Sequence, residues 1–74
     1  MKEVNIESDR DGGCWLELDG SKRYIASRAE AYRIKARVEA VQRAGATVER
    51  DKWHGGKSWG YYVSREFVGD IENI

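Results

Sequence analysis

The chain of 74 residues contains no proline, one cysteine, one histidine and no long hydrophobic run. A single cysteine excludes an internal disulfide, and Cys14, beside Trp15 in an apolar run, is interpreted as a small buried hydrophobic side chain. One cysteine and one histidine provide no paired ligands, so we expect no metal and no cofactor. No apolar run approaches the roughly 18 residues of a membrane span, and the N-terminus lacks the apolar segment of a secretory signal. We therefore expect a complete cytosolic protein in a reducing compartment, without membrane contact.

The lack of proline, repeats and low-complexity tracts also leaves no sign of a linker, so residues 1–74 are predicted to form one domain. A chain of this length buries only about 60% of its unfolded surface, which leaves little room for both a core and an enclosed active site. The three Trp, four Tyr and one Phe are expected to supply much of the core.

A net charge of zero conceals a strong asymmetry along the chain. Residues 21–43 contain seven basic and two acidic residues. Residues 1–20 contain two basic and six acidic residues, and residues 44–74 contain four basic and five acidic residues. The basic segment predicts an electropositive surface that binds a polyanion or an acidic protein. The alternative is a solvated helix face, because Arg and Lys are good helix formers and keep a small protein soluble.

Alternation of apolar and polar residues predicts strands over residues 2–8, 14–18 and 22–26. Asp19-Gly20 is typical of a type I′ hairpin turn, which needs positive φ at both central positions. A two-residue loop would pair Trp15 with Tyr24 and would place Leu16 opposite Arg23. A longer loop over residues 19–22 would change this register, and the sequence leaves both alternatives open.

Ser27-Arg28-Ala29-Glu30 has the form of a capping box and predicts a helix from Arg28 to Ala44, with Gly45 at its C-cap. Helical spacing places four apolar residues on the core face, namely Ala31, Ile34, Val38 and Val41. The opposite face carries Tyr32, Arg33, Ala36, Glu39, Ala40 and Arg43.

Two further strands are predicted over residues 47–53 and 58–65, joined by a loop over residues 54–57, and residues 66–74 are predicted to be a tail. The order β-β-β-α-β-β predicts an α+β fold of two layers, with one antiparallel sheet of about five strands and one helix packed on one face. The other face of the sheet would be wet, and alternation places on it either Trp15, Tyr24 and Tyr62 or Trp53, Trp59 and Tyr61. Exposed aromatic residues near arginine could stack the bases of a single-stranded nucleic acid.

The motifs that suggest catalysis are better explained as turns. Gly55-Gly56-Lys57-Ser58 has the form of the end of a phosphate-binding loop, but Asp51 stands where the loop needs its earlier glycine. His54 forms no recognisable relay with Ser58 or Cys14. We therefore expect no catalytic residues and no enzymatic activity.

Three stretches resemble the arm-type DNA-binding domains of phage integrases. They are Gly13-Cys14-Trp15-Leu16, Gly20-Ser21-Lys22-Arg23-Tyr24 and Ser27-Arg28-Ala29-Glu30-Ala31. In those domains a three-stranded sheet, supported by one helix, enters the major groove. The resemblance implies DNA binding that requires Lys22, Arg23 and Trp15.

The whole layout is similar to that of small phage anti-defence proteins, notably single-helix, antiparallel-sheet anti-CRISPR proteins. The similarity lies in the length, the strand order, the helix between Ser27 and Gly45, and the entry into the last hairpin at Gly45-Ala46-Thr47-Val48. Proteins of that kind bind a host nucleoprotein complex and do not act as catalysts. The resemblance implies that partner binding involves Lys22, Arg23, Arg28, Tyr32, Arg33, Lys35, Arg37 and Arg43, with Tyr32 as an aromatic anchor.

The leading hypothesis is a non-enzymatic binding module of a phage or mobile element. It would bind and inhibit a host protein or nucleoprotein complex through a basic surface on the helix and the adjoining strand, by steric and electrostatic occlusion. The alternative is a small DNA-binding accessory domain of the integrase arm type. A third hypothesis is an interaction domain that forms a homodimer through an edge strand, so the sequence leaves monomer and homodimer open.

Overall fold

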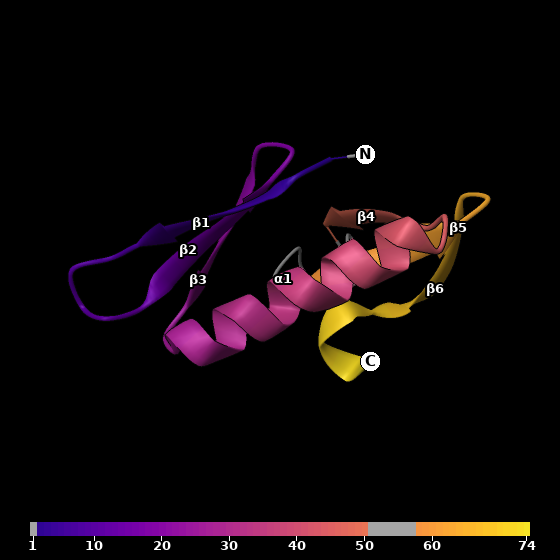
Figure 1. The fold of residues 1–74 in the computed structure, drawn as a ribbon. Coiled ribbons are helices and arrows are strands. Elements are labelled where there is room, and N and C mark those ends of the chain that lie inside the picture. The colour runs from indigo at the N-terminus through magenta and orange to yellow at the C-terminus, as the bar shows by residue number, and fades with distance from the viewer. Residues whose placement is uncertain (1, 51–57) are drawn as a thin grey trace.

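The computed structural model describes residues 2–50 and 58–74. The elements in chain order are β1 (Val4–Ser8), β2 (Cys14–Leu18), β3 (Ser21–Ile25), α1 (Arg28–Arg43), β4 (Thr47–Arg50), β5 (Trp59–Val63), β6 (Glu66–Asp70) and the short 3-10 helix η1 (Ile71–Asn73). The strands form two antiparallel sheets, which we call the N-terminal sheet (β1-β2-β3) and the C-terminal sheet (β4-β5-β6). Figure 1 shows α1 running past both sheets, and the α+β class is confirmed.

The β2–β3 hairpin closes through a two-residue turn. Asp19 and Gly20 have φ values of 49° and 83°, as a type I′ turn requires. Trp15 therefore lies opposite Tyr24, and Leu16 lies opposite Arg23. The shorter of the two predicted loops is the one that forms, and it directs Arg23 to the same face of the sheet as the buried Leu16.

Helix α1 begins and ends with hydrogen bonds that the sequence predicts. The Glu30 backbone N–H donates to Oγ of Ser27 at 3.3 Å. At the other end Gly45 has φ 97°, and the N–H groups of Gly45 and Ala46 donate to the carbonyl oxygens of Gln42 and Val41. This is a Schellman motif, which satisfies carbonyl groups left free at the helix end. The helix ends at Arg43 and its C-cap residue is Ala44, each one residue earlier than predicted, and Gly45 directly follows the C-cap.

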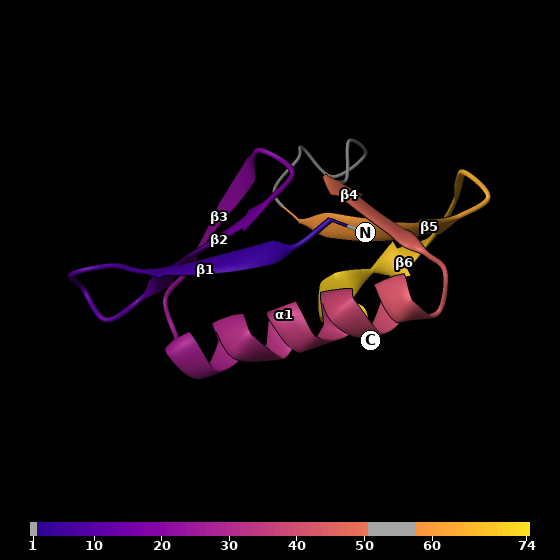
Figure 2. The same ribbon diagram turned by 45° about the horizontal axis from the view of Figure 1, so that its top comes forward.

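The core lies between α1 and the inner faces of the two sheets, which form the second layer (Figure 2). Ala31, Ile34 and Val38 are buried and Val41 packs against them, so the predicted core face of the helix is confirmed. The sheets contribute the side chains of Val4, Cys14, Leu16, Leu18, Val48 and Trp59, and η1 contributes Ile71. Cys14 is fully buried, as expected of a small hydrophobic side chain.

The prediction of one sheet of about five strands is wrong. The residues expected to form a tail instead supply β6, which pairs with β5 after a turn in which Ser64 and Arg65 have φ values of 51° and 69°. Neither residue is the Gly or Asn that usually marks such a turn, so the hairpin is hard to recognise in the sequence. The six strands of the described residues therefore divide into two sheets of three. Side-chain contacts, described below, connect the two sheets.

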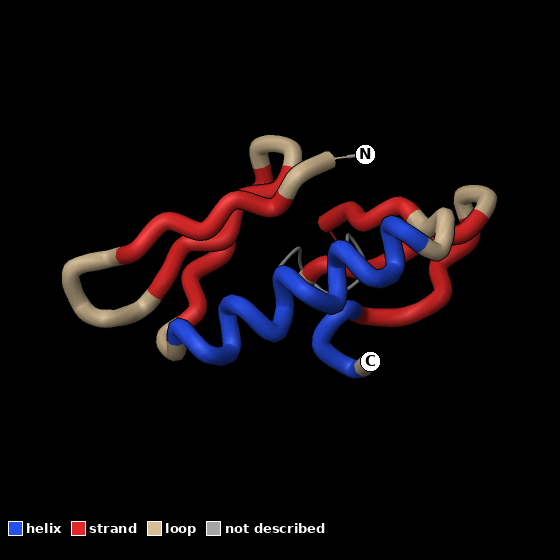
Figure 3. Tube along the Cα trace, in the orientation of Figure 1, coloured by secondary structure: helices blue, strands red, loops and turns tan. Residues whose placement is uncertain are grey.

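Helix α1 passes from one sheet to the other, as Figure 3 shows with the helix in blue and the strands in red. It contacts β1, β2 and β3 of the N-terminal sheet, and β4 and η1 on the C-terminal side. Within residues 2–50 and 58–74, no helix has both the length and the hydropathy needed to cross a bilayer.

Several sequence predictions fall on residues 51–57. They are the end of the fourth predicted strand with Trp53, the loop that carries His54, and most of the glycine-rich segment that ends at Ser58. These residues lie outside the part of the chain that the structure describes.

Candidate partner-binding surfaces

The half of α1 that points away from both sheets forms an exposed surface. This α1 outer face consists of Tyr32, Arg33, Ala36, Ala40 and Arg43, all of which are exposed. Tyr32 is the most exposed large hydrophobic side chain in the described structure, at 56%. The helical period explains the arrangement, because these residues lie opposite the core stripe of Ala31, Ile34 and Val38.

Charged residues of α1 lie within this face and beside it. The guanidinium of Arg33 pairs with the Glu30 carboxylate one turn earlier, at 3.0 Å. Arg28 is exposed and donates a hydrogen bond to Oγ of Ser8 at 3.1 Å, which ties the start of the helix to the end of β1. Lys35 and Glu39 are half-buried. Along α1, five cations stand against the two carboxylates of Glu30 and Glu39, so the helix is electropositive.

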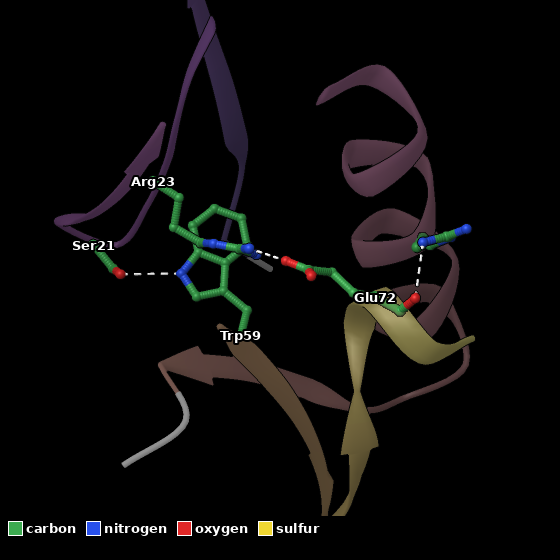
Figure 4. Close-up of polar contacts among 5 residues, drawn as sticks. Ser21, Arg23, Trp59 and Glu72 are labelled. Carbon is green, nitrogen blue, oxygen red and sulfur yellow. Dashed lines mark hydrogen bonds and ion pairs between the residues drawn. The ribbon is translucent and has the colours of Figure 1, made fainter. Parts of the chain in front are cut away.

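Arg23, a predicted partner-binding residue, lies inside the molecule. Its side chain is only 12% exposed and forms an ion pair with Glu72 of η1 (Figure 4). The Cζ atom of Arg23 lies 5.4 Å from the centroid of the Trp59 ring, a cation–π contact. Burial lowers the pKa of the Arg23 guanidinium, and the negative charge of Asp70 partly offsets this shift by raising it. Arg23 therefore holds the N-terminal sheet to the C-terminal part of the fold.

Arg37 and Lys22 also lie apart from the α1 outer face. Arg37 is half-buried on the side of the helix that faces η1, where it donates to the Glu72 carbonyl oxygen at 3.3 Å. Lys22 is exposed on the N-terminal sheet and lies opposite Glu17, on the face turned away from the helix. Of the eight predicted residues, Tyr32, Arg33 and Arg43 thus belong to the α1 outer face, and Arg28 and Lys35 lie beside it.

The aromatic residues follow the first of the two predicted arrangements. Trp15 and Tyr24 are 39% and 42% exposed on the outward face of the N-terminal sheet, and Tyr62 lies on the outward face of the C-terminal sheet. Trp59 is fully buried and Tyr61 packs against the core, whereas Trp53 is among the residues that the structure does not describe. The sequence interpretation missed Phe67, which is 43% exposed, because it fell in the predicted tail.

Residues 2–50 and 58–74 contain no group of three or more His, Cys, Asp or Glu side chains arranged to hold a metal ion. The thiol of Cys14 is buried beneath the N-terminal sheet. Exposed aromatic and charged side chains gather on the α1 outer face and on the outward faces of the two sheets.

Comparisons of the chain with protein-family models, with curated proteins and with solved structures found no match.

Proposed function

We propose that this chain is a non-enzymatic binding domain that inhibits a host protein or nucleoprotein complex, in the manner of small phage anti-defence proteins. The observation that carries the proposal is the α1 outer face, where Tyr32 is 56% exposed next to Arg33, and Arg43 lies further along the same face. A large aromatic side chain held on a rigid helix, with guanidinium groups on the same face, has the composition of a binding hot spot. The partner surface is acidic.

The mechanism is occlusion. The positive helix attracts an acidic surface over the distance that ionic screening allows, which speeds the encounter. Ala36 and Ala40 leave a shallow surface between the larger side chains, so a partner can approach the helix backbone closely while Tyr32 inserts as the anchor. Bound in this way, the domain covers a site that the partner needs for another macromolecule.

A binding role, as opposed to catalysis, is supported by the position of the reactive groups. The one thiol of the chain, in Cys14, is fully buried, and the guanidinium of Arg23 is engaged with Glu72 and Trp59. Neither side chain is presented to a substrate.

The DNA-binding alternative has weaker support. The element order of the N-terminal sheet and α1 agrees with an integrase arm-type domain. In that arrangement the outward face of the sheet would meet DNA, and here this face carries Glu7 and Glu17 against one cation, Lys22. Carboxylates at this position would repel phosphates, which supply much of the affinity of DNA-binding proteins.

The test is an affinity capture from a lysate of the native host, run with and without nuclease. We expect the tagged protein to retain a stoichiometric protein partner after nuclease treatment, and the double variant Arg33→Glu/Arg43→Glu to lose it. The control is Arg10→Glu/Lys22→Glu, which changes the net charge equally at the β1–β2 turn and on the outward face of the N-terminal sheet. Equal capture by the helix variant would refute the α1 outer face. Recovery of nucleic acid, or of proteins lost on nuclease treatment, would favour the DNA-binding alternative.

A further inference from the structure

The faces of the two sheets that are turned away from α1 carry matching pairs of aromatic residues. In the N-terminal sheet, Trp15 and Tyr24 are cross-strand neighbours whose ring centroids lie 5.4 Å apart, edge to face at 64°. In the C-terminal sheet, Tyr62 and Phe67 are cross-strand neighbours at 5.6 Å and 60°. We call these four side chains, one pair on the outward face of each sheet, the outer aromatic face.

In each pair, one aromatic ring lies directly over a glycine. A Cβ atom on Gly13 would lie 2.3 Å from Oη of Tyr24, and a Cβ atom on Gly60 would lie 2.8 Å from Cε2 of Phe67. Both rings therefore pack against backbone that only glycine leaves open. Although Tyr24 and Phe67 are more than 40% exposed, they are held in place. Rigid aromatic side chains lose little conformational entropy when they bind a partner.

The charge around the outer aromatic face is negative. Glu7 lies opposite Trp15 on the neighbouring strand, and Glu17 follows two residues after Trp15 on the same face. Glu49 is exposed on β4, where it alternates with the buried Val48. Against these three carboxylates, the same strand positions carry one ammonium group, that of Lys22. A negative surface with π faces attracts cations and repels phosphates.

A depression beside Trp15 brings an aromatic ring and carboxylate groups together. It is lined by Glu7, Ser8, Asp9, Trp15 and Lys22. The carboxylate of Asp9 accepts a hydrogen bond from the backbone N–H of Arg10 at 2.8 Å. At the edge of the depression, Oγ of Ser8 accepts a hydrogen bond from the guanidinium of Arg28. A cationic side chain in this depression would contact the indole of Trp15 and the carboxylate of Glu7 at once.

In the interior of the protein, a cation, an indole ring and a carboxylate already lie together. Arg23 lies over the indole of Trp59 and pairs with the carboxylate of Glu72. The contact shows that a guanidinium, an indole and a carboxylate can be accommodated together in this fold. At Trp15 the indole and the carboxylate lie at the surface, where the cation can come from another molecule.

We propose that the outer aromatic face binds a cationic segment of a partner protein, with an arginine or lysine side chain over Trp15 and paired with Glu7. This function goes beyond the one proposed above, because it uses the opposite side of the molecule and a partner of the opposite charge. Single-stranded nucleic acid would also stack on the rings, but three carboxylates oppose its phosphates. The negative charge therefore favours the peptide.

The test is an NMR titration of the whole protein with an octapeptide of alternating arginine and glycine. Its control is the same peptide with citrulline, which has the shape of arginine without the charge. We expect the indole N–H resonance of Trp15 to shift with the arginine peptide and to stay unchanged with the citrulline peptide. Trp15→Ala is expected to weaken binding about two- to fivefold, the range for an exposed cation–π contact. Glu7→Gln is expected to weaken binding and to reduce its dependence on salt.

Matched variants on the helix separate this proposal from the previous one. Tyr32→Ala and Arg33→Glu, on the α1 outer face, are expected to bind the arginine peptide as the wild type does. Equal binding of the citrulline peptide, or undiminished binding by Trp15→Ala, would overturn the proposal. Preferential binding of oligothymidine would assign the face to nucleic acid instead. If the Trp15 resonance moved with protein concentration alone, the occupant would be a second copy of the chain, and the proposal would also be wrong.

Discussion

The indole Nε1 of Trp59, on β5, donates a hydrogen bond to Oγ of Ser21, on β3, at 3.0 Å. This bond crosses the boundary between the two sheets, and the guanidinium of Arg23 lies over the same indole. Trp59 is fully buried. Side chains thus connect the sheets at a place where a continuous sheet would use backbone hydrogen bonds, and the stability of the fold depends on them.

Removal of the Ser21 hydroxyl leaves the buried N–H of Trp59 without its acceptor. We expect Ser21→Ala to lower the free energy of unfolding by about 1–2 kcal/mol, measured by urea denaturation. In a Trp59→Phe background, where the N–H is absent, the same substitution should cost less than about 0.5 kcal/mol. An equal cost in both backgrounds would show that the hydrogen bond contributes nothing.

Glu72 is the charge partner of a mostly buried guanidinium. We expect Glu72→Gln to destabilise the fold by about 1–2 kcal/mol, less than a fully buried pair would lose because solvent reaches Glu72. With Arg23→Met in place, the substitution should be nearly neutral, since no buried charge remains to be paired. A double-mutant cycle from urea denaturation gives the coupling, and a value near zero would contradict the ion pair.

The lowered pKa of Arg23 also fixes a sign for the pH dependence of stability. Because the pKa of Arg23 is lower in the folded state than in the unfolded state, folding disfavours the charged guanidinium and lowers the free energy of unfolding at every pH below the folded-state pKa. This loss of stability is relieved only as the pH rises through the folded-state pKa. Arginine remains protonated throughout the neutral range. We therefore expect the stability difference between the wild type and Arg23→Met to be constant across neutral pH. A slope in this difference, measured by thermal unfolding, would contradict this assignment.

The turn between β5 and β6 holds two non-glycine residues at positive φ. We expect Arg65→Gly to raise the free energy of unfolding by about 0.5–1 kcal/mol, because glycine adopts this conformation without steric cost. Gly20→Ala, at φ 83° in the other hairpin, is the opposite control and should destabilise by about 1 kcal/mol. The space around Gly20 is open, so its cost would come from the backbone alone. Stabilisation by both substitutions, or by neither, would count against backbone strain as the cause.

The two helix caps are expected to contribute separately. Ser27→Ala removes the acceptor of the Glu30 N–H and should cost about 1 kcal/mol. Gly45→Ala places a Cβ at φ 97° in the Schellman motif and should cost about 1 kcal/mol. Since the two ends of α1 are far apart, the double variant should lose the sum of the two costs in urea denaturation. A cost well below the sum would indicate that the helix frays at one end already.

Local signals in the sequence predicted much of this fold. The Asp19-Gly20 turn, the Ser27 cap, Gly45 and the core stripe of α1 each depend on neighbours within a few residues, and each is confirmed. The C-terminal strand was missed because Ser64 and Arg65 carry no turn signal, and β6 forms only through its pairing with β5.

The candidate surfaces were predicted less well, because charge along the chain does not determine position in space. Arg23 and Lys22 are adjacent in the sequence, and strand alternation sends one side chain into the core and the other to solvent. The ion pair between Arg23 and Glu72 joins residues 49 positions apart, which no local pattern predicts. The acidic character of the outer aromatic face likewise depends on the register that brings Glu7 beside Trp15.

Helix α1 contacts both sheets, and η1 at the chain end packs against the helix and against β5. Unfolding of η1 would expose Ile71, would uncover Trp59 and would separate Glu72 from Arg23 on β3. Fraying that begins at η1 would therefore also weaken the N-terminal sheet, although within the described residues the three strands of that sheet pair only with one another. We therefore expect the amide protons of both sheets to exchange with solvent through one opening of the whole molecule, and the protein to unfold as a single cooperative unit in spite of its divided β-structure.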